Sequence, residues 1–378
     1  MKRVLAIVLI VCLLGGLPVF AGNETAFLDQ VEVQPAQSMG IPLRTDYILR
    51  CAATVQDGIP VAVTLTSGTP ATFNVVNLET GKLENYIELD EGETYWTIET
   101  DSKGNVYFAS YNKPCKLYRY DPVTKQLKNL GEIPGTTALI SLAFDDDDNP
   151  WLGTYPNASI VKYDVTAGQF INYGRMKTGE QYLQGLAYHS GKLYYCFQTK
   201  PGLYVFNPET GTKNEMPALP AGYTQTSGQK MFLRGQYIIA LVGAAKNGGS
   251  EMSCLFFYDT LTGKWKDKVV ENVYGQYISK INNGVFYYKS SKAADGHALF
   301  RFDMNTFTST KTSLTFGSYI RGTDFVEVKR PDVAGTCFVN AQYNGRLYLM
   351  NFEKGKTVTY EGMLHGSPAA IRRITFDD

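Results

Sequence analysis

The stretch Leu255-Phe-Phe-Tyr-Asp259-Thr-Leu-Thr-Gly263 carries the pattern that decides the fold. A run of apolar and aromatic residues, typical of a β-strand, leads into an Asp, and a Gly follows four residues later. The Asp side chain can hydrogen-bond the backbone of its own turn, and Gly accepts a positive φ there. The stretch therefore predicts a β-hairpin whose turn begins at Asp259.

The same pattern recurs along the chain, seven times in all. The other copies have their Asn or Asp at Asn77, Asp121, Asp164, Asn207, Asp303 and Asn351. Successive copies lie 44, 43, 43, 52, 44 and 48 residues apart. Five copies have Gly at the last position, and Lys125 and Phe307 replace it in the other two. Seven copies of one turn signal favour a structural role for these side chains over the alternative of catalytic carboxylates.

A second hairpin signal precedes most copies, for example Lys103-Gly104-Asn105 and Ser190-Gly191-Lys192. Each repeat therefore holds four strands, here called a to d, at a period of about 45 residues, which is the size of a propeller blade. Helical periodicity is absent, which argues against βαβ repeats. The sequence predicts an all-β fold, a β-propeller over residues 41–378 with seven four-stranded blades. The predicted blades are 41–90, 91–135, 136–179, 180–222, 223–274, 275–317 and 318–362.

Residues 366–378 resemble the beginning of a further blade. One interpretation is that this strand closes the ring against the first blade. The other is that the sequence is a piece of a longer protein with more blades. The residues leave both interpretations open.

The N-terminus has the pattern of a secretory signal peptide. Met1-Lys2-Arg3 is positively charged, Val4–Leu17 is almost wholly apolar, and Val19-Phe20-Ala21 offers a cleavage site. The apolar run is shorter than the roughly 20 residues of a membrane-spanning helix, which disfavours the alternative of a retained anchor. We expect a signal peptide at 1–21, an N-terminal segment at 22–40, and a secreted or periplasmic protein that is not held in a membrane after cleavage.

The composition limits the partners and cofactors. The chain has 36 basic and 36 acidic residues, so it has no basic field that would attract nucleic acid. Three histidines leave little room for a His-rich metal site. The acidic run Asp145–Asp148 is interpreted as a turn rather than a calcium loop, so we predict neither a metal nor a cofactor.

The mature chain, without Cys12 of the signal peptide, has an odd number of widely spaced cysteines. This pattern favours buried free thiols over a disulfide framework, and one chance disulfide is the alternative. These cysteines are Cys51, Cys115, Cys196, Cys254 and Cys337.

The repeats resemble the secreted bacterial β-propellers of the streptogramin-lyase-like and YVTN/NHL-like group. The resemblance lies in Asp101-Ser-Lys-Gly-Asn-Val-Tyr-Phe108, Asp148-Asn-Pro-Trp-Leu-Gly-Thr154 and the repeated Tyr-Asp-x-x-Thr-Gly turns. It implies the propeller fold, in a group that includes lyases, lactonases, sensors and binding modules. Streptogramin lyases carry an acid of their metal site at the end of strand b. Here the corresponding places end in Ser110 and Thr154, so that acid is missing.

The d-to-a and b-to-c connections of a propeller meet on one face, around the central channel, and this face is the expected binding site. Its predicted ligand-binding residues mix aromatic rings, an amide and a cation, which suits a sugar ligand. The alternative is that Tyr simply populates the strands and rims of any propeller. The candidates are Trp96, Tyr111, Tyr155, Tyr182, Gln184, Tyr277, Tyr319 and Arg321.

Two functions remain open. The first is a non-catalytic binding or scaffold protein whose ligand is a glycan or another small polar molecule, and a protein partner is the further alternative. The alternative is a lyase or hydrolase that acts on a polysaccharide or cyclic ester and uses Tyr, Arg or His at the same face. Its catalytic candidates are His297, His365 and Arg321, whereas His189 is assigned to a turn on the opposite face.

Overall fold

The computed structural model describes residues 44–89, 95–111 and 114–368. All of the described residues belong to one compact unit, Leu43–Asp378. The predicted signal peptide at 1–21 and the segment at 22–40 lie outside the described residues. Within the described ranges, no helix has the length and apolar character needed to cross a membrane.

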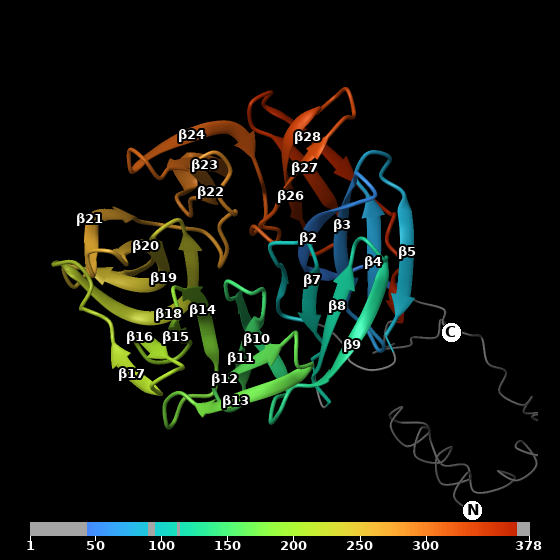
Figure 1. Cartoon of the computed structure of the whole chain (residues 1–378). Helices are drawn as coiled ribbons and strands as arrows, with labels where there is room; N and C mark the ends of the chain where they lie inside the picture. The colour runs from blue at the N-terminus through green and yellow to red at the C-terminus, as the bar shows by residue number, and fades with distance from the viewer. Residues whose placement is uncertain (1–43, 90–94, 112–113, 369–378) are drawn as a thin grey trace, which may run out of the picture. The chain divides into compact units, whose positions relative to one another are not determined.

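Seven antiparallel sheets of the described residues form blades around a central axis, and a further two-stranded sheet lies beside them, so the predicted seven-bladed propeller is confirmed (Figure 1). The only helix in the described part of the chain is a short 3-10 turn at Ala293–Asp295. The first blade consists of β2 (Ile48–Gln56), β3 (Ile59–Thr66), β4 (Thr72–Asn77) and β5 (Leu83–Glu88). The second consists of β6 (Ile98–Thr100), β7 (Val106–Ala109), β8 (Lys116–Asp121) and β9 (Gln126–Glu132). The third consists of β10 (Ala138–Phe144), β11 (Pro150–Tyr155), β12 (Ser159–Asp164) and β13 (Gln169–Arg175).

The remaining four blades follow the same order from the inner to the outer strand. The fourth consists of β14 (Leu183–His189), β15 (Lys192–Phe197), β16 (Leu203–Asn207) and β17 (Thr212–Glu215). The fifth consists of β18 (Tyr223–Arg234), β19 (Tyr237–Lys246), β20 (Glu251–Asp259) and β21 (Lys264–Val270). The sixth has the regular strands β22 (Val285–Lys289), β23 (Ala298–Asp303) and β24 (Thr308–Thr315), and its innermost position is held by a segment in which Ser279 N donates to Tyr287 O at 2.9 Å. The seventh consists of β25 (Phe325–Val328), β26 (Gly335–Ala341), β27 (Leu347–Asn351) and β28 (Lys356–Tyr360).

The repeated turn motif joins the two outer strands of every blade. In the fifth blade, Asp259 Oδ1 accepts a hydrogen bond from Leu261 N at 3.1 Å, and Gly263 has a φ of 69°. Lys125 and Phe307, which replace Gly in two copies, adopt the same left-handed conformation with φ of 59° and 53°. The hydrogen bonds of the Asp or Asn side chain therefore impose the turn even where the side chain at its end makes it costly.

A hydrophobic cluster fills each interface between neighbouring blades. Of the described residues, one cluster joins the first and second blades through Phe73 and Phe108, and another joins the fifth and sixth through Phe257 and Phe286. The other interfaces have equivalent clusters, so seven blades share seven apolar interfaces. Because every blade buries both of its faces against neighbours, closure into a ring leaves no apolar sheet face uncovered.

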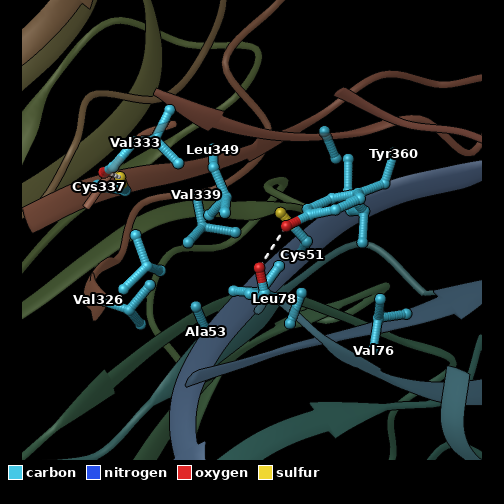
Figure 2. Close-up of a cluster of buried hydrophobic side chains, with 14 of the residues drawn as sticks. Cys51, Ala53, Val76, Leu78, Val326, Val333, Cys337, Val339, Leu349 and Tyr360 are labelled. Atoms are coloured by element: carbon cyan, nitrogen blue, oxygen red, sulfur yellow. Dashed lines mark hydrogen bonds between the residues drawn. The ribbon is translucent and has the colours of Figure 1, made fainter. Parts of the chain in front are cut away.

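The interface between the seventh and first blades closes the ring (Figure 2). Val326, Val339 and Leu349 of the seventh blade pack with residues such as Cys51 and Val76 of the first. The Tyr360 hydroxyl donates to the backbone oxygen of Leu78 across the same interface. In addition, β1 (Arg44–Thr45) pairs with β29 (Ser367–Pro368) in a separate two-stranded sheet. Ser367 Oγ donates to Thr66 O on β3 at 2.7 Å, so the beginning of the expected additional strand contacts the first blade. Residues 369–378 lie outside the described residues.

All five described cysteines are buried free thiols, as the sequence predicts. Burial raises the pKa of Cys51, Cys115, Cys196 and Cys337 to about 12, and that of Cys254 to about 11. A thiol with so high a pKa carries almost no thiolate at neutral pH and is a poor nucleophile. The cysteines therefore act as small core residues.

Candidate functional site

Two adjoining cavities open on the face formed by the d-to-a and b-to-c connections. The wide cavity has a volume of about 600 Å³ and the narrow cavity one of about 240 Å³. Four residues line both of them: Gln184, Gln198, Gln276 and Tyr277. A cavity system of this size is in the range that accommodates small ligands.

The structure brings the eight predicted ligand-binding residues together at these two cavities. The narrow cavity is lined by Trp96, Tyr111, Tyr155, Tyr182, Gln184 and Tyr277. The wide cavity is lined by Gln184, Tyr277, Tyr319 and Arg321. Leu49 of the first blade and Gln229 of the fifth also line the wide cavity, so all seven blades contribute residues to the two cavities.

The aromatic side chains at the cavities form pairs. The rings of Tyr155 and Tyr182 stack with their centroids 4.3 Å apart. The rings of Trp96 and Tyr111 form an edge-to-face pair with their centroids 6.2 Å apart. Tyr319 stacks on Tyr274 at 4.6 Å. Trp96 is 48% exposed although it is the largest type of side chain, so its indole face is available to a ligand.

Three side chains form the floor beneath the narrow cavity: Arg50 on β2, Lys230 on β18 and Tyr277. The Arg50 guanidinium lies 3.7 Å over the Tyr277 ring, and Lys230 Nζ is 5.3 Å from the centroid of the same ring. Burial alone raises the pKa of Tyr277, but the charges of Lys230 and Arg50 outweigh it and hold the pKa below its usual value. The two nearby cations thus stabilise the phenolate form of Tyr277 more than burial destabilises it.

Arg50 is fixed by its neighbours. It is only 2% exposed, and its Nη2 donates to Glu99 Oε1 at 3.0 Å while its Nε donates to the backbone oxygen of Arg321 at 3.0 Å. Its buried Nη1 has no hydrogen-bond partner among the described residues. Arg50 therefore keeps one donor unused at the floor.

Lys230 is a buried cation at the same level. It is 6% exposed, and its Nζ donates to the backbone oxygen of Ile140 at 3.0 Å. No carboxylate of the described residues forms an ion pair with it, and no Asp or Glu among them lines the wide or the narrow cavity. Arg321, at the wide cavity, donates from Nη1 to Leu49 O at 2.8 Å and keeps a buried Nε without a partner in the described structure. The two cavities therefore have a positive electrostatic character.

Arg50 and Lys230 were not predicted from the sequence. Arg50 lies within the largely apolar strand β2, and Lys230 follows a polar stretch of β18 in which the sequence does not show which side chains face the channel. Shifts in the pairing of β18 with β19 occur between Gln225 and Ser227 and between Gly228 and Lys230. Such β-bulges re-aim side chains. The available signal was the presence of a cationic side chain within an inner strand, Arg50 in β2 and Lys230 in β18.

A third cavity, of about 500 Å³, lies on the other side of the floor, towards the a-to-b turns. Arg50, Lys230 and Tyr277 line it too, together with acidic residues such as Asp145 and Asp148. These carboxylates already have partners. Asp145 accepts hydrogen bonds from Trp151 Nε1 and from backbone N–H groups of its turn, and Asp148 binds Ser102. In the described ranges, no group of three or more His, Cys, Asp or Glu side chains could hold a metal ion. Asp145 of the acidic run instead stabilises its own turn through hydrogen bonds.

The interactions of these carboxylates predict how the stability of the fold changes as the pH falls. Burial raises the pKa of Asp145, but the ion pair with Lys162 at 2.9 Å and the hydrogen bonds from Asn149 and Trp151 outweigh it and lower the pKa below its ordinary value. A carboxylate with a depressed folded-state pKa stabilises the fold above its unfolded pKa of about 3.9, and that stabilisation is lost as the pH falls through the folded-state value. We expect urea-unfolding midpoints to be level between about pH 7 and 5 and to fall below about pH 4. Asp145→Asn should lower the midpoint at neutral pH and flatten the acid decline, and an equally steep decline in this variant would contradict the assignment.

The catalytic candidates lie apart from one another. Arg321 lines the wide cavity, whereas His365 Nε2 lies 3.4 Å from Glu88 Oε1 on the outermost strand of the first blade, and its ring stacks on Tyr86 at 3.8 Å. His297 is exposed directly after the 3-10 turn, with a φ of 62°. Neither histidine lines the wide or the narrow cavity. A histidine-based catalytic cluster is therefore not assembled among the described residues.

Comparisons with known proteins identify the fold alone. No protein-family model matches the sequence, and no curated protein sequence matches it either. Among solved structures, virginiamycin B lyase from Staphylococcus aureus is similar with a TM-score of 0.54 and 14% sequence identity, over 81% of this chain and 96% of that one. A catalytically inactive histidine-to-alanine variant of the same lyase, solved with quinupristin, has the same TM-score and identity and is covered over 95% of its length. The expected resemblance is thus confirmed at the level of the fold: this chain is a β-propeller similar in architecture to the streptogramin-type lyases.

Proposed function

We propose that this protein binds an acidic glycan in the wide and narrow cavities. A secreted or periplasmic location, as the N-terminal 21 residues suggest, would give it access to such polymers. The proposal extends the general binding role that the propeller scaffold supports to one class of ligand.

The aromatic and amide side chains support a sugar ligand. Sugar rings present flat apolar faces that stack on aromatic side chains, and their hydroxyl groups need both donors and acceptors. The rims supply rings such as Trp96 and Tyr319, and the shared wall supplies the amides of Gln184, Gln198 and Gln276. An amide offers a donor and an acceptor side by side, which matches a pair of neighbouring hydroxyls.

The observation that carries the proposal is the unpaired charge of Lys230. A buried cation is costly unless an anion compensates it, and none of the described carboxylates forms an ion pair with Lys230. Arg321 and its free Nε add a second positive group, and neither cavity has an acidic residue in its lining. A carboxylate on the ligand would supply the missing counter-charge, which neutral sugars cannot do.

The known activity of the structural neighbour is not transferred to this chain. The neighbour loses catalysis when one histidine is replaced, and it was solved with quinupristin. Of the described histidines, none lines the wide or the narrow cavity, so the residues there do not support the same chemistry.

Calorimetric titration with oligosaccharides tests the proposal. We expect oligouronates to bind and neutral oligosaccharides of the same length to bind at least about tenfold more weakly, with the difference shrinking as salt screens the charges. Trp96→Ala should weaken binding about tenfold because a stacking face is lost. Tyr86→Ala is the matched control, since Tyr86 is 47% exposed but lies on the outer strand β5. Equal affinity for acidic and neutral ligands, or no binding of either, would overturn the proposal.

A further inference from the structure

We propose that Tyr277 is a catalytic residue that cleaves the bound acidic glycan by β-elimination, first as proton acceptor and then as proton donor. This inference rests on the proposed function, because it takes the acidic glycan as substrate. It adds an activity to the binding role.

The position of Tyr277 separates it from every other tyrosine at the cavities. It lines the wide cavity, the narrow cavity and the cavity beneath the floor, so it stands where the three spaces meet. Arg50 lies 3.7 Å over its ring, and Lys230 lies on the side of the narrow cavity at 5.3 Å. Tyr155 and Tyr182 instead pair with each other. Tyr277 is therefore the tyrosine of the site whose phenolate two cations stabilise.

The cations have a second effect on the substrate. When positive charge from Lys230 and Arg321 neutralises the carboxylate of a uronate, the hydrogen on the neighbouring carbon C5 becomes acidic, because the negative charge that develops on its removal spreads into the carboxylate. A proton acceptor beside those cations can then remove it. Lys230, with no carboxylate partner in the described structure, is free for this contact.

The elimination balances without any further reactant. The Tyr277 phenolate accepts the proton from C5, the C4=C5 double bond forms, and the bond between C4 and the glycosidic oxygen breaks. The tyrosine hydroxyl then returns the proton to the departing oxygen. The products are a shortened glycan with a new hydroxyl end and a fragment that begins with an unsaturated uronate, and neither water nor an oxidant is consumed.

Hydrolysis is the alternative way to break such a chain, and the residues present do not support its usual form. Glycoside hydrolysis ordinarily employs a pair of carboxyl groups on either side of the bond. Of the described residues that line the wide and narrow cavities, none is Asp or Glu. Elimination requires one proton-transferring group and positive charge, which the site has.

A single tyrosine that performs both proton transfers restricts the substrate. The proton must leave and return on the same face of the sugar ring, so the C5 hydrogen and the C4 oxygen must share a face. They do so in glucuronate and mannuronate, and they lie on opposite faces in galacturonate. We therefore expect cleavage of polymannuronate or of a glucuronate-containing polymer, but not of polygalacturonate.

The test combines product formation with binding. The protein is incubated with polymannuronate, a glucuronate-containing glycosaminoglycan and polygalacturonate, and the ultraviolet absorbance of the unsaturated uronate is followed. We expect product from at least one of the first two, at a rate that rises with pH as Tyr277 ionises. Tyr277→Phe should reduce the rate at least about 100-fold, the scale of acid–base catalysis, while it changes the affinity less than about threefold. Tyr258→Phe, a partly buried tyrosine of β20 away from the cavities, is the control and should keep the full rate.

The outcomes separate this inference from the proposed function. Binding of the acidic glycans without unsaturated product, or product formation that Tyr277→Phe leaves unchanged, overturns the catalytic role and leaves the binding role intact. Absence of binding to every acidic glycan overturns the proposed function itself. A thermal melt of Tyr277→Phe that matches the parent protein shows that a lost rate is not a lost fold.

Discussion

Replacing Lys230 with methionine is expected to weaken the binding of an acidic oligosaccharide by about 10- to 100-fold. A hydrogen bond to a charged group is worth about 1.5–3 kcal/mol, and each factor of ten in affinity corresponds to about 1.4 kcal/mol. Methionine has most of the volume of the aliphatic part of the Lys230 side chain. The loss of affinity therefore comes from the missing charge at the floor of the cavity. Affinity for any neutral sugar that binds should change much less.

Lys264→Met provides the matched control for this substitution, because Lys264 is exposed at the beginning of the outer strand β21. Calorimetric titrations of the parent and both variants with one oligouronate give the comparison. If Lys230→Met binds the oligouronate as tightly as Lys264→Met does, the carboxylate of the ligand does not meet Lys230 and the assignment of the anionic subsite is wrong.

Replacing Asp324 with alanine is expected to lower the free energy of unfolding by about 3 kcal/mol, because a hydrogen bond to a charged group contributes about 1.5–3 kcal/mol and Asp324 accepts two of them from other blades. Asp324 is 5% exposed and lies just before β25 in the seventh blade. Its Oδ2 accepts from Ala53 N in the first blade at 2.9 Å, and its Oδ1 accepts from Thr100 Oγ1 in the second blade at 3.0 Å. Lys280 Nζ of the sixth blade lies 2.7 Å from the same Oδ1. One carboxylate therefore ties four blades together near the channel.

Urea unfolding of the Asp324→Ala variant measures this effect, and Asp267→Ala on the exposed part of β21 is the control. Substitutions at such surface positions usually change stability by less than about 0.5 kcal/mol. A similarly small change for Asp324→Ala would show that the apolar interfaces alone hold the ring closed.

The fold was predictable because its signal repeats. Asp259 and its six counterparts mark the same turn in every blade, and the period between them sets the size of the blade. Even Lys125 and Phe307 did not obscure the pattern, since the Asp at the start of each turn accepts the backbone hydrogen bonds that define it.

The rim of the site was predictable for the same reason. Once the strands are assigned, each d-to-a and b-to-c connection must reach the channel face, so Trp96, Tyr155 and Tyr319 could be placed there from their positions in the repeat. Their place in the repeat does not decide whether they contact a ligand, and their role in binding stays a prediction.

The floor of the site could not be found in this way. Lys230 is directed to the channel by irregular pairing in β18, and Arg50 occupies a position where a strand pattern predicts an apolar side chain. Both depend on contacts between blades far apart in the sequence, such as Lys230 Nζ with Ile140 O. His365 was expected at the channel face, and the structure places it elsewhere for a similar reason. It follows the seventh blade in sequence, but it contacts Glu88 on the outermost strand of the first blade.

The most direct test of the central claim compares one polyuronate with its carboxyl-reduced form, in which each carboxylate has become a neutral hydroxymethyl group and the ring stereochemistry is unchanged. Titration of the protein with matched oligosaccharides of both forms isolates the contribution of the charge. We expect reduction to weaken binding at least about tenfold in the parent protein, and this difference to disappear largely in Lys230→Met. Equal affinity of the parent protein for the two forms would contradict the claim.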